Sequence, residues 1–175
     1  MEFFKMNQLK NNFTTILACS FFLLLFSCDS DEYPTENYMH VYINGYEWEA
    51  FQFTVTSSQN SNGEVEIAIV ATAELNEAVI IGIQGFPDEI QSRTQEITSL
   101  ANGDFLGYRE EGNATGIETH SSFGCTTIDG SIFIEEYNTE EGYISGTFGG
   151  TVCSQGAQDI VTFSSGEFLR ISLDQ

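Results

Sequence analysis

Residues 64–72 alternate between large apolar side chains and polar or small ones. The apolar set is Val65, Ile67 and Ile69, and the opposite set is Glu64, Glu66 and Ala68. A period of two residues is typical of a β-strand with one buried face and one wet face. No long segment of the chain shows the 3.6-residue period of a helix. The pattern therefore predicts an all-β fold.

Further strand-like segments follow one another at intervals of roughly 8–12 residues, separated by Gly-rich turns. They are His40 to Asn44, Tyr46 to Thr56, Ala78 to Gln84, Phe105 to Arg109, Gly116 to Phe123, Gly130 to Tyr137, Tyr143 to Val152, Ile160 to Phe163 and Gly166 to Leu173. Asn44-Gly45 predicts a tight turn. This spacing favours a single antiparallel β-sandwich or barrel-like domain over residues 39–175.

Two parts of this pattern carry more specific expectations. In the last strand, Leu169, Ile171 and Leu173 are expected to share one face. Residues 87–102 fit either a short helix that begins at Pro87 or an irregular connection.

The N-terminal segment has the composition of an export signal. Lys5 and Lys10 precede a mostly apolar run from Phe13 to Phe26, which is shorter than the about 20 residues needed to span a bilayer. Leu25-Phe26-Ser27-Cys28 resembles a bacterial lipoprotein box. We expect residues 1–27 to be a removed signal peptide and Cys28 to carry a lipid with fatty acids such as palmitate. The alternatives are a plain signal peptide and a transmembrane anchor.

Residues 28–38 are polar and read as an acidic tether. Asp29, Asp31 and Glu32 directly follow the lipidation candidate and resemble the acidic export tag of Bacteroidota lipoproteins. This predicts an outer-membrane protein anchored on the extracellular face. The alternatives are an ordinary solvated linker and an anchor that faces the periplasm.

The chain has a formal net charge of −21. Such a domain repels nucleic acid phosphates, so we expect no nucleic acid partner. The expected membrane contact is the lipid on Cys28. We expect a monomeric domain with an unidentified surface ligand or outer-membrane protein partner.

Four cysteines divide into three roles. Cys19 lies in the signal segment and Cys28 is the lipidation candidate. Cys125 and Cys153 remain, and in an oxidising compartment they are expected to form a disulfide. A metal pair or redox couple is the alternative, although the spacing is not that of a Cys-x-x-Cys motif.

No catalytic signature is found, and we predict no enzyme activity, metal or cofactor. His40 and His120 are expected to be loop or surface residues rather than catalytic bases. Adjacent carboxylates, such as Glu135-Glu136, are expected to be solvated rather than to form a glycosidase pair. The loop at residues 60–64 lacks the final bidentate glutamate of a calcium loop.

The aromatic residues can be interpreted either as part of the core or as a ligand-binding surface. Trp48, with Tyr46, Phe51 and Phe53 near it, is expected to lie in the core, although a sugar-binding platform would use the same residues. The candidates for exposed contacts are Tyr33, Tyr38, Tyr108, Tyr137 and Tyr143.

Three short motifs resemble a family of small Bacteroidota lipoproteins of unknown function. They are Asn44-Gly45-Tyr46-Glu47-Trp48-Glu49-Ala50, Ile144-Ser145-Gly146-Thr147-Phe148 and Ser165-Gly166-Glu167-Phe168. The resemblance implies an all-β domain behind a lipid anchor and brings no known activity. We therefore expect a non-enzymatic binding or interaction module on the cell surface. An inward-facing structural or accessory subunit of an outer-membrane complex is the alternative.

Overall fold

Antiparallel strands make up most of the part of the chain that the computed structural model describes. This part comprises residues 37–73, 77–90, 94–96, 103–112, 116–156 and 158–173, and it belongs to the second of two units, residues 34–175. The strands are β1 (Tyr38–Ile43), β2 (Tyr46–Glu49), β3 (Gln52–Gln59), β4 (Val65–Thr72), β5 (Ala78–Gly85), β6 (Thr94–Glu96), β7 (Phe105–Gly112), β8 (Gly116–Ser121), β9 (Gly130–Asn138), β10 (Tyr143–Cys153) and β11 (Ile160–Ser172). The helical elements are α2 (Pro87–Ile90) and a 3₁₀ turn at Ser122–Gly124. The all-β prediction is confirmed.

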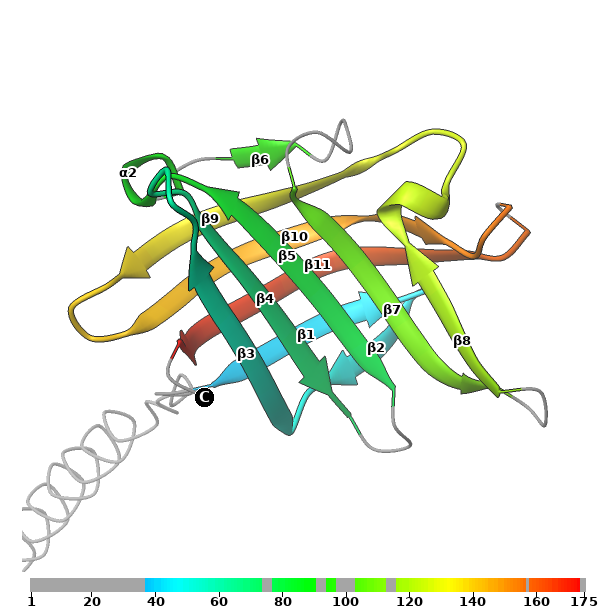
Figure 1. Ribbon diagram of the computed structural model, residues 1–175. Coiled ribbons are helices and arrows are strands. Elements are labelled where there is room, and N and C mark those ends of the chain that lie inside the picture. The colour runs from blue at the N-terminus through cyan, green and yellow to red at the C-terminus, as the bar shows by residue number, and fades with distance from the viewer. Residues whose placement is uncertain are drawn as a thin grey trace, which may run out of the picture. The chain divides into compact units, whose positions relative to one another are not determined.

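The strands form one sheet in the order β2-β1-β11-β10-β8-β7-β5-β4-β3, with β9 beside β10 and β6 beside β9. Figure 1 shows the sheet curled over into two layers, with β3, β4, β5, β7 and β8 in front of β1, β11, β10 and β9. This is a half-barrel. It lies between the sandwich and the barrel that the sequence left open.

The second predicted strand, Tyr46 to Thr56, is wrong as one element. The chain ends β2 at Glu49, passes through Ala50 and Phe51, and begins β3 at Gln52. β2 pairs with β1 in the back layer, whereas β3 pairs with β4 in the front layer. The predicted turn at Asn44-Gly45 is present, with positive φ angles of 52° and 83°, as a tight hairpin turn requires.

The last strand also differs from its prediction, because Ile160 to Ser172 form one strand with two irregularities. Ser165 and Arg170 have φ angles of 51° and 46°, and the register with β10 shifts opposite both. Each bulge reverses the side-chain alternation. Ile171 is therefore buried while Leu169 is only half-buried, so the expectation that the two share a face with Leu173 is wrong.

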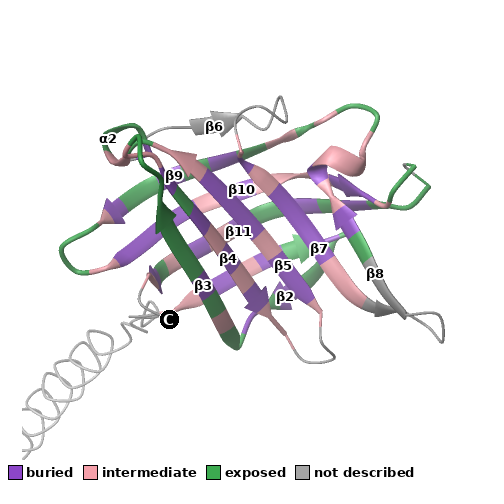
Figure 2. Cartoon of the chain, viewed as in Figure 1, coloured by how far each residue is buried: buried purple, intermediate pink, exposed green. Residues whose placement is uncertain are grey.

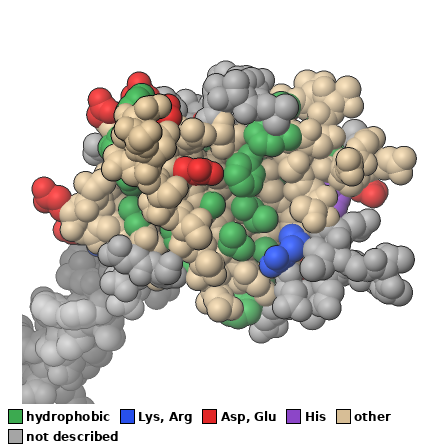
Figure 3. Space-filling model, viewed as in Figure 1, with side chains coloured by type: hydrophobic (Ala, Val, Ile, Leu, Met, Phe, Trp, Pro, Cys, Tyr) green, Lys and Arg blue, Asp and Glu red, His purple; other side chains and the backbone are tan. Residues whose placement is uncertain are grey.

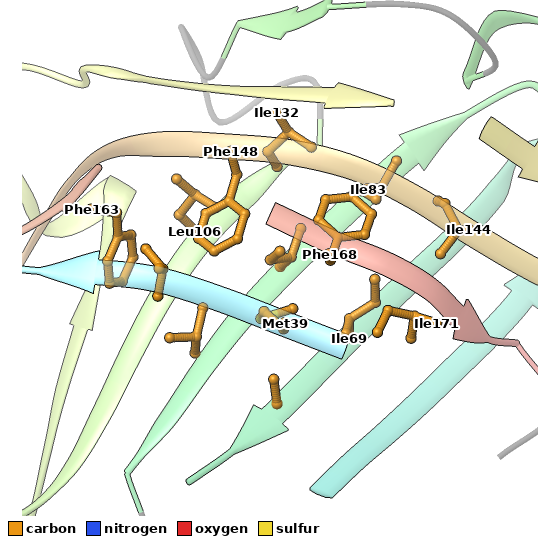
Figure 4. Close-up of a cluster of buried hydrophobic side chains, with 14 of the residues drawn as sticks. Met39, Ile69, Ile83, Leu106, Ile132, Ile144, Phe148, Phe163, Phe168 and Ile171 are labelled. Atoms are coloured by element: carbon orange, nitrogen blue, oxygen red, sulfur yellow. The ribbon is translucent and has the colours of Figure 1, made fainter. Parts of the chain in front are cut away.

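The core lies between the two layers. Figure 4 shows side chains from both layers pointing toward one another, among them Met39 of β1, Ile69 of β4, Leu106 of β7 and Phe168 of β11. Figure 2 shows that the burial alternates along the strands and that β3 is mostly exposed. Val65, Ile67 and Ile69 are all buried, as their alternation predicts.

Two phenylalanines on β10 and β11 each pack across the sheet onto a glycine of the other strand. Gly146 is opposite Phe168, and Phe148 is opposite Gly166. A Cβ atom on Gly166 would lie 2.7 Å from the Phe148 ring, and one on Gly146 would lie 2.7 Å from the Phe168 ring. Both glycines belong to the late sequence motifs, so these motifs have a packing role.

We predict that Gly166→Ala destabilises the domain by about 1–3 kcal/mol, because an added methyl group must displace the Phe148 ring. Gly149→Ala is the matched control on β10, because its Cβ would meet its nearest neighbour at 3.5 Å. Denaturant unfolding measures both free energies. Equal effects of the two substitutions would contradict the packing argument.

A disulfide joins Cys125 to Cys153, with the Cα atoms 4.9 Å apart. It lies at the seam where the front layer meets the back layer, since Cys153 of β10 pairs with Ser121 of β8. Gly124 lies against this seam, where a Cβ atom would come within 2.3 Å of the Cys153 carbonyl oxygen. The bond therefore reinforces a junction at which one register pair connects β8 to β10.

Replacing Cys125 and Cys153 together by serine is expected to lower the free energy of unfolding by about 3–4 kcal/mol, since the bond closes a long loop. Chemical denaturation of both proteins, with and without reductant, measures this loss. Reductant should destabilise the wild type and leave the double variant unchanged. A wild type that is insensitive to reductant would argue against a stabilising bond.

Candidate functional site

The residues predicted to direct export lie outside the described residues. This applies to Cys28, Asp29, Asp31 and Glu32, and to most of the predicted tether. Their roles therefore stay predictions. Within the described residues, no helix combines the length and apolar character needed to cross a membrane.

Both histidines lie in strands, and the expectation of a loop or surface position is wrong for His120, which is buried. His120 is on β8 with an exposed fraction of 1%. Its ring centroid lies 6.0 Å from that of Tyr108 on the adjacent strand β7. Its Nδ1 atom has no hydrogen-bond partner among the described residues. His40 on β1 is half-buried, with its Nε2 atom 3.2 Å from a Glu47 carboxylate oxygen.

The aromatic predictions are partly right. Trp48 is buried in the core as expected, but its neighbours Tyr46 and Phe51 are 79% and 64% exposed. The expectation of exposed contacts is wrong for Tyr108, Tyr137 and Tyr143, which are buried. Tyr108 and Tyr137 belong to the core, whereas Tyr143 is covered by the guanidinium of Arg170.

The loop at residues 60–64 is organised by its own side chains. Asn60 Oδ1 accepts hydrogen bonds from the backbone N–H groups of Asn62 and Glu64, at 2.9 and 3.1 Å. Asn60 Nδ2 donates to a Glu64 carboxylate oxygen at 2.7 Å. Across the described ranges, no three His, Cys, Asp or Glu side chains cluster as metal ligands would.

A small polar pocket of about 130 Å³ lies where the β9–β10 turn meets the end of β11. It is lined by Asn37, Glu141, Gly142, Tyr143, Arg170 and Ser172. Arg170 is central to it. Its guanidinium carbon lies 4.0 Å from the centre of the Tyr143 ring, and its Nη2 atom lies 3.3 Å from Glu141 Oε2.

Arg170 is held in a backbone conformation that costs an L-residue roughly 1–2 kcal/mol. Three hydrogen bonds fix it there. Its N–H donates to Ser145 Oγ at 2.9 Å, and its carbonyl accepts from the Asn37 N–H at 3.3 Å. Asn37 Oδ1 in turn accepts from the Ser172 N–H at 2.9 Å. Strain that is fixed by its surroundings in this way is typical of functional positions.

Tyr143 forms the floor beneath the guanidinium. Its hydroxyl donates to the Glu136 carboxylate and accepts from Asn138 Nδ2. The hydrogen bond to Glu136, followed by burial, raises the pKa of Tyr143 above its ordinary value. The hydroxyl therefore stays protonated at neutral pH and fixes the ring under Arg170.

The lining of this pocket presents several polar and charged groups to a ligand. It offers a guanidinium, a carboxylate, an amide and a hydroxyl, which suit a small polar or anionic group. Sequence reasoning missed the pocket because Asn37 and Ser172 are 135 positions apart.

A second surface feature lies on the outer face of the front layer. The β4–β5–β7 register places Val70 beside Ile80 and Ala68 beside Gly82, over which the Phe105 ring lies. These apolar side chains are half-buried. Figure 3 shows hydrophobic side chains gathered along the middle of this face. We call Ala68, Val70, Ile80 and Phe105 the apolar stripe.

Comparison with protein-family models, with curated proteins and with solved structures found no match. The resemblance to small Bacteroidota lipoproteins therefore stays a prediction.

Tyr108 provides a test of the interior. Burial, followed by the nearby carboxylates of Glu77 and Glu110, raises its pKa above the ordinary value of 10.0. An unfolded chain ionises this hydroxyl near pH 10, whereas the folded domain keeps it protonated. Its contribution to stability is therefore complete below pH 10 and is lost as pH rises further.

We predict that Tyr108→Phe reduces the loss of stability between about pH 9 and pH 11, because this substitution removes the titrating group. Thermal unfolding across this range, with Tyr46→Phe as the exposed control, measures the effect. An identical alkaline decline in wild type and Tyr108→Phe would contradict it.

Proposed function

We propose that the chain is a lipid-anchored lipoprotein of the bacterial envelope, displayed on the cell surface, that acts as a monomeric, non-enzymatic binding module. The observation that carries the proposal is Leu25-Phe26-Ser27-Cys28 at the end of a short apolar run. The acidic residues directly after it support placement on the outer face of the outer membrane. A single acyl chain binds membranes weakly, whereas several chains anchor stably.

The β domain suits a binding role. It is a disulfide-linked half-barrel that presents the Arg170 pocket beside a turn, and rigid scaffolds commonly present binding residues in this way. The guanidinium of Arg170 places a positive charge in the pocket of a chain whose formal net charge is −21. A small anionic or polar ligand is the chemistry that fits it.

An accessory subunit of an outer-membrane complex is the second candidate. The apolar stripe favours it, because contiguous apolar residues on a sheet face are typical of protein contacts. The two candidates differ in the side of the membrane on which the domain resides.

Incorporation of labelled palmitate tests the anchor. We expect labelling of the wild type and of Cys19→Ser, and none of Cys28→Ser, because only Cys28 occupies the lipidation position. Labelling that survives Cys28→Ser would contradict the anchor.

Protease treatment of intact cells tests the side of the membrane, with a periplasmic protein as the protected control. We expect cleavage of the wild type and protection of a variant with Asp29, Asp31 and Glu32 neutralised. Protection of the wild type until lysis, in a protein that is cleaved once released, would reject surface display and support the accessory role.

A further inference from the structure

The outer edge of β3 is an open strand edge with unusual chemistry for this chain. β3 ends the strand order and pairs only with β4 among the described strands. It runs for eight residues, and its register with β4 is unbroken. Exposed edges of this length are templates for pairing with another chain.

The hydrogen-bond ladder defines which backbone groups face outward. Asn60 N–H donates to the Glu64 carbonyl at 2.9 Å, which continues the β3–β4 register. Bonded pairs recur at every second residue of an antiparallel ladder, so the even-numbered residues of β3 bond to β4. Phe53, Val55, Ser57 and Gln59 therefore direct their N–H and C=O groups away from the sheet.

The ladder on the other side of β4 gives the same assignment. Ala73 N–H donates to the Glu77 carbonyl at 3.0 Å, which extends the β4–β5 register. Odd-numbered residues of β4 therefore bond to β5, and its even-numbered residues are available to β3. Two independent hydrogen bonds therefore agree that the odd-numbered residues of β3 direct their backbone groups away from the sheet.

β3 lacks the charges that protect other open edges. β2 is four residues long and carries Glu47 and Glu49. The second half of β9, which pairs only with β10 among the described strands, carries Glu135 and Glu136. β3 reads Gln-Phe-Thr-Val-Thr-Ser-Ser-Gln and has no charged residue. Charged side chains are a common means of preventing edge pairing, and this edge has none.

The two faces beside β3 differ in chemistry. On the inner face, Val55 is buried and Phe53 is half-buried against the core. On the outer face, Ser58 lies opposite the exposed Glu66. A basic side chain beside Ser58 on an added strand would lie two strand spacings, roughly 9–10 Å, from the Glu66 backbone, within reach of its carboxylate.

We propose that the β3 edge binds an extended segment of a partner protein in which apolar and basic residues alternate, added to the sheet as a further strand. Its apolar side chains would lie beside Phe53 and Val55, and its basic ones beside Ser58, within reach of the Glu66 carboxylate. The charge of −21 attracts such a segment and disfavours a second copy of the chain. This inference rests on the proposed binding role and names a partner class for it.

The test uses a fluorescent peptide of five Lys-Val repeats and the purified full-length protein at about 0.15 M salt, where surface charges are screened beyond about 8 Å. Ser57→Pro removes an outward N–H group without removing a β4 bond. We expect it to weaken peptide binding at least about tenfold, since backbone hydrogen bonds are lost and their neighbours are displaced.

Ser61→Pro is the matched control. Ser61 occupies the second position of the turn closed by the Gly63 N–H to Asn60 carbonyl bond, where proline is favoured. It leaves net charge and the β3 edge unchanged, so peptide affinity should equal that of the wild type. Equal affinity of Ser57→Pro and Ser61→Pro would show binding elsewhere and overturn the proposal.

A second pair of variants does not depend on how proline is tolerated. Glu66→Gln should weaken binding up to about fivefold, as expected for an exposed ion pair. Glu135→Gln makes the same charge change on exposed β9 and should have no effect.

Two further outcomes would reject the proposal. They are absence of peptide binding by the wild type, and dimerisation of the protein that Ser57→Pro abolishes, which would identify a second copy as the occupant. The binding measurement uses purified protein. A negative result would therefore reject the β3 proposal without bearing on surface display, which the protease test examines separately.

Discussion

The fit of Phe148 and Phe168 over two glycines is the contact on which much of this fold depends. β10 and β11 pair along most of their lengths, and the two rings lie side by side, with centroids 6.3 Å apart. Phe163 extends the cluster toward Tyr108 of the front layer, with centroids 6.3 Å apart. One cross-strand arrangement therefore joins the back layer to the front layer. The same device recurs in the front layer, where Phe105 lies over Gly82.

The curled shape follows from irregularities in these long strands. Ser165 and Arg170 interrupt β11 with positive φ angles, and bulges of this kind increase local twist. Gly150, with a φ of 147°, marks the point beyond which β10 leaves β9 and approaches β8. The disulfide lies just past that point. Twist thus brings the layers together, and a covalent bond holds them at the seam.

The features that could be predicted from the sequence are those that depend on the local pattern of apolar and polar residues. Alternation located β4, and the Asn44-Gly45 turn follows from the φ preference of its residues. The break at Ala50 and Phe51 was missed because apolar character continues through it, and only tertiary pairing separates β2 from β3. The bulge at Arg170 was missed because no glycine marks its positive φ. His120 was misplaced because a lone polar residue does not reveal which strand face is buried.

The candidate sites show the same limit. The cysteine pair could be predicted because Cys125 and Cys153 are the two cysteines that lie outside the predicted signal and lipidation positions. The Arg170 pocket depends on Asn37, Tyr143 and Arg170, which only the strand order brings together. The open edge of β3 was equally invisible, since a strand's neighbours are a property of topology rather than of its own residues.

Asn37 also determines how the domain would bear a mechanical load. Its backbone N–H and its side-chain oxygen are both bonded to β11, immediately before β1 enters the sheet between β2 and β11. Tension applied through the preceding residues therefore reaches the interior of the sheet rather than a peripheral strand. To extract β1, a pulling force must break the ladders on both of its sides, which makes the start of this domain a firm attachment point.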